Sequence, residues 1–169
     1  IVGMIEHRVF NGRGLAVTER NDIIFRPPAA SVPAQNAKKK KLEPRPLEAP
    51  SASWVRVIAP DPVLMFRHSA VTFNSHRIHY DRDYVREKGY PGLLVQGTLI
   101  ARLLLDMLHQ EMPEFDVSSF SFRSGRPIYD NGNFTIEATP NTAGDEVAFR
   151  ALDFAGNVGM TAQAMRVAV

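Results

Sequence analysis

The chain has 169 residues and a mass of 18.8 kDa, with 44% hydrophobic residues, 22% charged residues and a formal net charge of +2. This composition is typical of one ordinary globular domain with appendages, and not of a disordered or fibrous chain. A net charge near zero argues against a nucleic-acid surface. The absence of cysteine excludes disulfides and thiolate metal sites, and no apolar run approaches the roughly 20 residues of a membrane span.

The N-terminal segment has the pattern of a β-hairpin. Residues 4–10 and 15–25 have strand character and flank the turn sequence Asn11-Gly12-Arg13-Gly14, and Asn-Gly between two such runs is a strong hairpin signal. A two-stranded hairpin is marginal alone, so it must pack on something. The chain opens on Ile-Val-Gly without an initiator Met or a targeting pattern. We therefore expect that its beginning is missing and that the protein is cytoplasmic.

The composition changes abruptly after this hairpin. Residues 29–53 are rich in Pro, Ala and Lys, have little to bury, and are expected to form an extended linker. The run of four lysines at 38–41 fits a solvated linker better than a tag for anionic surfaces. The predicted organisation is therefore a hairpin over residues 1–28, a linker over 29–53, and one domain over 54–169.

The domain is expected to open with a strand over residues 54–58. Residues 63–73 are largely apolar and are predicted to start as a helical turn and then become extended. A short helix over residues 81–88 has Asp81 as its N-cap and closes at Gly89. The strongest helix follows, because apolar residues recur there every three or four positions before Pro113 ends the run. These residues are Leu94, Leu99, Leu103, Leu104, Met107 and Leu108.

Three or four further strands are predicted, over residues 117–122, 134–138, 146–153 and 159–167. The segments between them carry Asn, Asp and Gly, which are typical turn residues. One buried helix followed by an antiparallel meander indicates an α+β fold, with a sheet wrapped around that helix.

One segment concentrates side chains capable of chemistry. Between residues 72 and 81 the chain carries Asn74, His76, His79, Tyr80 and Asp81. The segment lies between two predicted elements, and loops held by rigid elements are where catalytic groups tend to sit.

This segment (Thr-Phe-Asn-Ser-His-Arg-Ile-His-Tyr-Asp) and residues 89–99 (Gly-Tyr-Pro-Gly-Leu-Leu-Val-Gln-Gly-Thr-Leu) resemble the MaoC-like hydratases. The similarity is greatest to the branch of mesaconyl-CoA and itaconyl-CoA hydratases and type 2 hydroxyacyl-thioester dehydratases, and it covers residues 54–169. The resemblance implies a hot-dog fold, in which an antiparallel sheet wraps around a long central helix. It also implies a hydro-lyase of fatty acid metabolism that needs no cofactor or metal and acts on acyl-CoA or acyl carrier protein thioesters.

The family motif assigns the catalytic residues by position. Its histidine falls on His79, the general base, and its carboxylate, five residues earlier, falls on Asn74. An amide can orient a water but cannot take its proton, so the acid–base work should fall on His79. The resemblance further assigns the thioester oxygen to the backbone N–H of Gly97, because that oxygen becomes negative in the reaction and needs a preorganised donor.

The resemblance also indicates residues that bind substrate. Gln96 and Thr98 flank Gly97 and are expected to shape the pocket. Arg77 and Arg123 are candidates for the CoA phosphates, because guanidinium groups match phosphate oxygens. His76 is grouped with them, although a structural role is favoured for it. The other residues also have purely structural alternatives. His79 could cap or hydrogen-bond at the junction between elements, and Asn74 could form a turn. Gly97 could serve only for close packing, and the arginines could form surface ion pairs.

In this branch two hot-dog units are commonly fused in one chain, with the active site between them. The N-terminal hairpin looks like the end of a truncated first unit, so we expect either a homo-oligomer such as a dimer or pairing with a second hot-dog unit. Two other functions stay open. One is a hot-dog thioesterase, which usually needs a carboxylate on the central helix, and residues 93–105 contain none. The other is a non-catalytic subunit that binds thioesters or lends structure to an active partner.

Overall fold

The computed structural model describes residues 2–25 and 52–167. The chain divides into two compact units, residues 1–41 and 42–169, and each is described by itself. Apart from its last two residues, the predicted linker over residues 29–53 lies outside the described parts of the chain.

The first unit contains the predicted hairpin. Strand β1 (Val2–Asn11) pairs antiparallel with β2 (Gly14–Ile24), and Asn11 lies opposite Gly14 at the turn. The Asn11 side chain accepts a hydrogen bond of 2.8 Å from the Arg13 N–H, and Gly14 has a φ of 114° that favours glycine. The hairpin prediction is therefore confirmed.

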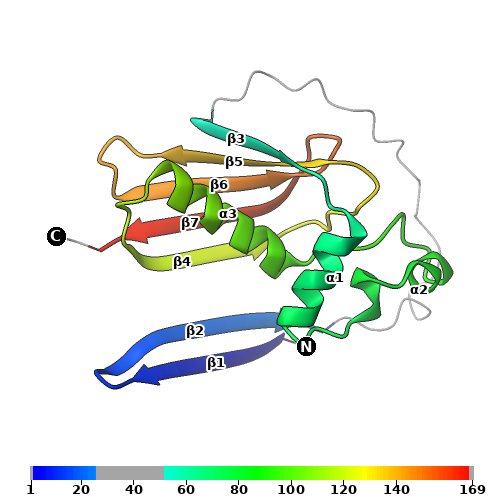
Figure 1. The fold of residues 1–169 in the computed structure, drawn as a ribbon, viewed down its shortest axis with the longest axis horizontal. Coiled ribbons are helices and arrows are strands. Elements are labelled where there is room, and N and C mark those ends of the chain that lie inside the picture. The colour runs from blue at the N-terminus through cyan, green and yellow to red at the C-terminus, as the bar shows by residue number, and fades with distance from the viewer. Residues whose placement is uncertain (1, 26–51, 168–169) are drawn as a thin grey trace. The chain divides into compact units, whose positions relative to one another are not determined.

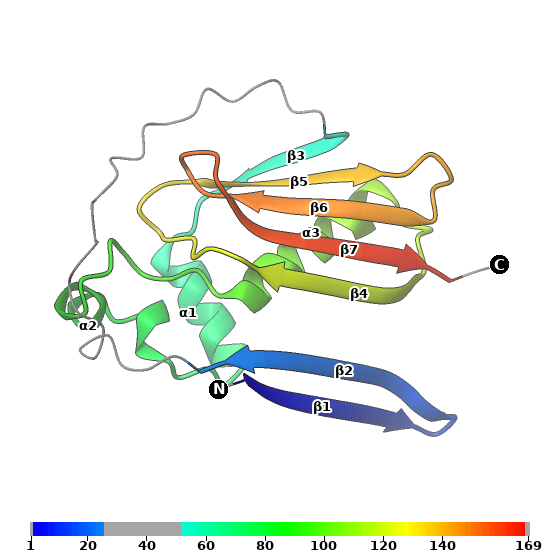
Figure 2. The same ribbon diagram turned by 180° about the vertical axis from the view of Figure 1, so that it is seen from behind.

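The second unit is a five-stranded antiparallel sheet packed on one long helix. The strand order is β3 (Trp54–Ile58), β5 (Phe134–Pro140), β6 (Glu146–Leu152), β7 (Val158–Arg166) and β4 (Val117–Ser124). Helix α3 (Gly97–Glu111) runs across one face of this sheet, in front of it in Figure 1 and behind it in Figure 2. All five predicted strands form, and the predicted α+β architecture is confirmed.

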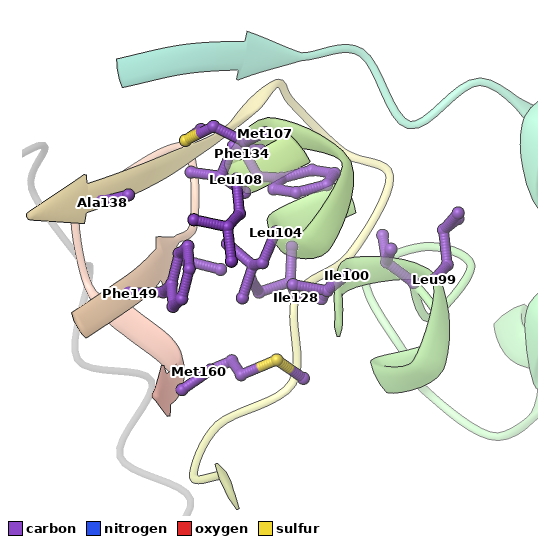
Figure 3. Close-up of a cluster of buried hydrophobic side chains, with 14 of the residues drawn as sticks. Leu99, Ile100, Leu104, Met107, Leu108, Ile128, Phe134, Ala138, Phe149 and Met160 are labelled. Atoms are coloured by element: carbon purple, nitrogen blue, oxygen red, sulfur yellow. The ribbon is translucent and has the colours of Figure 1, made fainter. Parts of the chain in front are cut away.

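The core lies between α3 and the inner face of the sheet (Figure 3). Leu104 and Met107 of α3 are completely buried, and Phe134, Phe149 and Met160 from the strands are at most 2% exposed. Full burial of one such side chain contributes about 1.5–3 kcal/mol. This contact fixes the start of α3 relative to the sheet, and that start is where the candidate site lies.

The central helix begins later than its apolar pattern predicts. Leu94 is not helical but forms an isolated bridge with Tyr129. Its N–H donates to the Ile78 carbonyl, and the next N–H, of Val95, donates to the Ile128 carbonyl, both at 2.9 Å. The prediction that Leu94 belongs to the helix is wrong, because these neighbours hold the segment before Gly97 in an extended conformation.

The prediction that residues 63–73 become extended is also wrong. Helix α1 (Pro62–Val71) occupies nearly all of this segment, and the Asp61 carboxylate caps it by accepting from the N–H groups of Val63 and Leu64. Proline suits a first helical position because its missing N–H has no partner there. The cap and the proline together start a helix that the apolar pattern alone left ambiguous.

Helix α1 ends in a Schellman motif with a phenylalanine where glycine is usual. The N–H of Phe73 donates to Ala70 and the N–H of Asn74 donates to Ser69, which is the pair of bonds that defines the motif. Phe73 has a φ of 52°, and its side chain is 94% exposed. The turn redirects the chain into the 3₁₀ turn η2 (Arg77–His79) and helix α2 (Arg82–Glu87). Asp81 is the N-cap of α2, as predicted.

Candidate active site

His79 is the last residue of η2 and is only 8% exposed. Its Nδ1 lies 2.7 Å from the Leu94 carbonyl oxygen. A carbonyl only accepts, so Nδ1 carries the hydrogen and donates it. In the neutral ring Nε2 then keeps its lone pair, which gives His79 the form that a general base requires.

The surroundings of His79 keep its ring neutral. Burial lowers the pKa of His79 from its ordinary value of 6.5, and positive charge on His76 and His68 lowers the pKa further, whereas the bond to the Leu94 carbonyl raises it. The net shift is downward, because removing a charged imidazolium from water is the largest of these effects. His79 is therefore available to accept a proton at neutral pH.

The start of α3, three residues after the carbonyl that His79 contacts, leaves a backbone donor open. Gly97 is the first residue of the helix, and Gln96, its N-cap residue, makes no side-chain cap. Within the described part of the chain, no acceptor is bound to the Gly97 N–H. The first N–H groups of a helix are unpaired within it and carry the positive end of its dipole, so they suit an anionic oxygen.

Glycine at position 97 also lets the helix start pack closely on the sheet. A Cβ there would lie 3.2 Å from the Ser124 hydroxyl of β4 and 3.6 Å from the Met160 methyl of β7. The close packing thus supports a structural role for Gly97. That role is compatible with an unpaired N–H, because packing depends on the missing Cβ and hydrogen bonding depends on the backbone nitrogen.

Gln96 joins two helices. Its side chain is 1% exposed, and its Nε2 donates at 2.9 Å both to the Met65 carbonyl and to the Ser69 hydroxyl of α1. Over residues 2–25 and 52–167, its Oε1 is buried without a hydrogen-bond partner. Gln96 thus fixes α1 against the start of α3, which accounts for its failure to cap the helix.

The remaining residues of the sequence motif lie on the loop between α1 and η2. Asn74 is half-buried, and its Oδ1 accepts a hydrogen bond of 3.1 Å from the His76 N–H, as in a turn. His76 is exposed, and its ring meets the edge of the His79 ring with 5.7 Å between centroids. The geometry thus supports a turn-forming role for Asn74 and brings His76 next to His79.

The two candidate phosphate-binding arginines differ in their partners. Arg77 donates two hydrogen bonds, of 2.9 and 2.8 Å, to Asp81, and its guanidinium lies 4.4 Å above the Tyr84 ring. The bond to Asp81 raises the pKa of Arg77, which is thus engaged within its own loop. Arg123, on β4, is exposed and forms no ion pair with any residue that the structure describes.

The structure adds one residue that the sequence interpretation did not single out. His68, on α1, is 8% exposed, and its Nε2 lies 2.9 Å from the Thr98 hydroxyl at the start of α3. A helical reading of residues 62–71 would have placed Met65, His68 and Ser69 on one buried face, which they form in the structure. The expectation of an extended segment concealed this signal.

The described ranges contain no group of three or more His, Asp or Glu residues that could hold a metal ion. None of the helices within them is long and apolar enough to cross a membrane.

An antiparallel five-stranded sheet packed on one long helix is the hot-dog arrangement, and here a buried imidazole donates to the Leu94 carbonyl, three residues before that helix. The chain matches the family described as hydroxyacyl-thioester dehydratase type 2 over residues 1–130, and it belongs to this family. The resemblance and the hot-dog fold predicted from the sequence are therefore confirmed.

The chain is 41% identical over 152 residues to the mesaconyl-C(4)-CoA hydratase of Chloroflexus aurantiacus, covering 87% of this chain and 49% of that protein. It is 33% identical over 85 residues to the mitochondrial hydroxyacyl-thioester dehydratase type 2 of Schizosaccharomyces pombe, covering 48% and 28% of the two chains. Among solved structures it is similar to the (R)-hydratase of A. caviae involved in PHA biosynthesis, with a TM-score of 0.56, 16% identity, and coverage of 69% and 96%. The chain thus spans half or less of the curated relatives it matches.

Proposed function

We propose that this chain hydrates the double bond of an enoyl thioester and, in reverse, dehydrates a 3-hydroxyacyl thioester. One observation carries the proposal: His79 donates from Nδ1 to the Leu94 carbonyl, which leaves its Nε2 as a base, and the open N-terminus of α3 begins at Gly97, three residues after Leu94. Membership of the type 2 dehydratase family supports the same activity.

In the dehydration direction, Nε2 of His79 takes the α-proton of the substrate. The electron pair of the broken C–H bond moves toward the thioester carbonyl, and the Gly97 N–H stabilises the negative oxygen. The β-hydroxyl then leaves as water with the proton returned by the imidazolium, and the double bond forms. Hydration reverses these steps, with His79 taking the proton of the attacking water. Because the Asn74 Oδ1 is bound to the His76 N–H, Asn74 orients that water through its amide N–H₂ group.

The substrate we propose is an acyl-CoA, with small dicarboxylic acyl groups such as mesaconyl as the first to be tested, because a relative at 41% identity is named for that substrate. The family match includes the hairpin and the chain covers 49% of the mesaconyl-C(4)-CoA hydratase, which supports the hairpin of residues 1–28 as the end of a further hot-dog unit. We propose that the hot-dog unit of residues 54–169 works as a homo-oligomer or paired with a second hot-dog unit.

The test incubates the protein with an enoyl-CoA and measures two signals, the absorbance of the conjugated thioester and the release of free thiol. Hydration removes the absorbance of the conjugated thioester without releasing a thiol, whereas a thioesterase releases free CoA. A non-catalytic subunit changes neither signal. Only the first outcome supports the proposal.

The role of His79 is tested with a matched pair of substitutions. His79→Ala should lower kcat by about 10²- to 10⁴-fold, the usual contribution of a positioned base. His109→Ala removes an exposed histidine from the last turn of α3 and should leave kcat within about two-fold. A His79→Ala enzyme that retains a rate within a few-fold of the parent would exclude this residue as the base.

A further inference from the structure

The mechanism proposed above leaves one buried histidine unused. His68 on α1 is 8% exposed, and its Nε2 lies 2.9 Å from the Thr98 hydroxyl. Thr98 itself is exposed, and it directly follows the half-buried Gly97 at the start of α3. The hydroxyl of an exposed residue is thus held by a buried imidazole, and that residue directly follows the one whose N–H is open.

The direction of the Thr98 side chain follows from helix geometry. In an α-helix every Cα–Cβ bond tilts toward the N-terminus. The hydroxyl of the second residue therefore lies toward the same end of α3 to which the N–H of the first residue points. A thioester oxygen bound at the Gly97 N–H would lie within the reach of both groups.

The surroundings of His68 favour its neutral form. Burial lowers the pKa of His68 most, and the charge of Arg102, one turn along α3 from Thr98, lowers the pKa further. The neutral imidazole that results has one N–H to donate. If that hydrogen is on Nε2, it occupies a lone pair of the Thr98 oxygen and leaves the hydroxyl hydrogen for another acceptor.

We propose that Thr98 is a catalytic residue, the second donor to the thioester oxygen, and that His68 is a positioning residue that orients its hydroxyl. His68 Nε2–H donates to Thr98 Oγ1, and the Thr98 O–H donates to the substrate oxygen beside the Gly97 N–H. This inference rests on the function proposed above. It gives the site the two convergent donors that stabilise a developing oxyanion better than one.

The experiment is a double-mutant cycle in the full-length protein, assayed by hydration of an enoyl-CoA. Thr98→Val removes the hydroxyl at nearly constant shape and should lower kcat by about 10- to 100-fold with little change in KM, because the lost bond is strongest in the transition state. Thr98→Ser keeps the hydroxyl and should stay within a few-fold of the parent.

His68→Leu should lower kcat in the same way, and His68→Gln, which keeps an N–H donor, should restore most of the rate. In a Thr98→Val background, His68→Leu should cost almost nothing more, because His68 acts only through the hydroxyl. A histidine that merely supports the fold would lower kcat in both backgrounds.

A second readout needs no turnover. The infrared stretching frequency of the thioester carbonyl in a bound, unreactive acyl-CoA reports how strongly donors polarise it. Thr98→Val should move this frequency toward its value in free acyl-CoA, and Thr98→Ala serves equally if the valine variant folds poorly.

Three results would overturn the inference. They are a Thr98→Val enzyme with kcat within three-fold of the parent, additive effects in the double variant, or an acyl group found covalently on Thr98, which would make the hydroxyl a nucleophile. If Thr98→Val is fully active while His79→Ala is inactive, this inference fails and the proposed function survives. If the parent itself does not hydrate the enoyl-CoA, the proposed function fails first.

Discussion

Replacing Asp130 by alanine should destabilise the hot-dog unit by about 2–3 kcal/mol. The Asp130 side chain is 2% exposed, and its carboxylate accepts a hydrogen bond of 2.8 Å from the Leu93 N–H and one of 2.6 Å from Arg82. Leu93 is 1% exposed, so its N–H would lose its acceptor in a dry site, at a cost of about 1–3 kcal/mol. The pair with half-exposed Arg82 adds at most about 1 kcal/mol.

The Asp130 variants are compared by urea unfolding, followed by the fluorescence of Trp54. This is the only tryptophan of the chain and lies in β3, so its signal reports the hot-dog unit. Asp130→Asn keeps an oxygen that can accept from Leu93 and should cost less than Asp130→Ala. As a control, Asp83→Ala removes a carboxylate that is 91% exposed and should change stability by less than about 0.5 kcal/mol. An Asp130→Ala protein as stable as this control would refute the reasoning.

Four further outcomes are expected. Leu104→Ala, at a site of zero exposure between helix and sheet, should cost about 2–5 kcal/mol in urea unfolding; a loss under 1 kcal/mol would contradict the packing described. Phe73→Gly should stabilise the protein by about 0.5–1 kcal/mol, because it relieves a positive φ and removes a side chain that is 94% exposed; a lower midpoint would show that the side chain makes a stabilising contact. Because burial lowers the pKa of His79 below 6.5, the unfolded chain takes up its proton first as pH falls. The contribution of neutral His79 to the stability of the folded protein should be complete above about pH 6.5 and should be lost as pH falls through the pKa that His79 has in the folded state. The kcat/KM profile should show an acid limb at an apparent pKa below 6.5, and a limb above that value would contradict the assignment.

The strands and the body of the central helix could be predicted from sequence because their signals are local. Alternation and turn residues set the strands, and apolar spacing set α3 beyond Leu99. The start of α3 could not be predicted this way, because Leu94 fits the helical spacing. What keeps it extended is pairing with residues 128–130, more than thirty positions away. Sequence periodicity carries no information about such a partner.

The apolar run before the motif shows a different limit. A short apolar segment is ambiguous between helix and strand, and the local signal that decides it is the Asp61 cap followed by Pro62. Missing that helix also meant missing His68, whose role depends on the face it occupies. His79, in contrast, was found by its motif, although its tautomer depends on a carbonyl fifteen residues later.

The acceptor that orients His79 belongs to the backbone, and every amino acid supplies the same main-chain oxygen. A substitution at position 94 therefore changes the side chain there while the ring keeps the hydrogen bond that fixes its tautomer. An engineer can thus vary the side chain at position 94, directly beside the proposed base, without having to rebuild the support of that base.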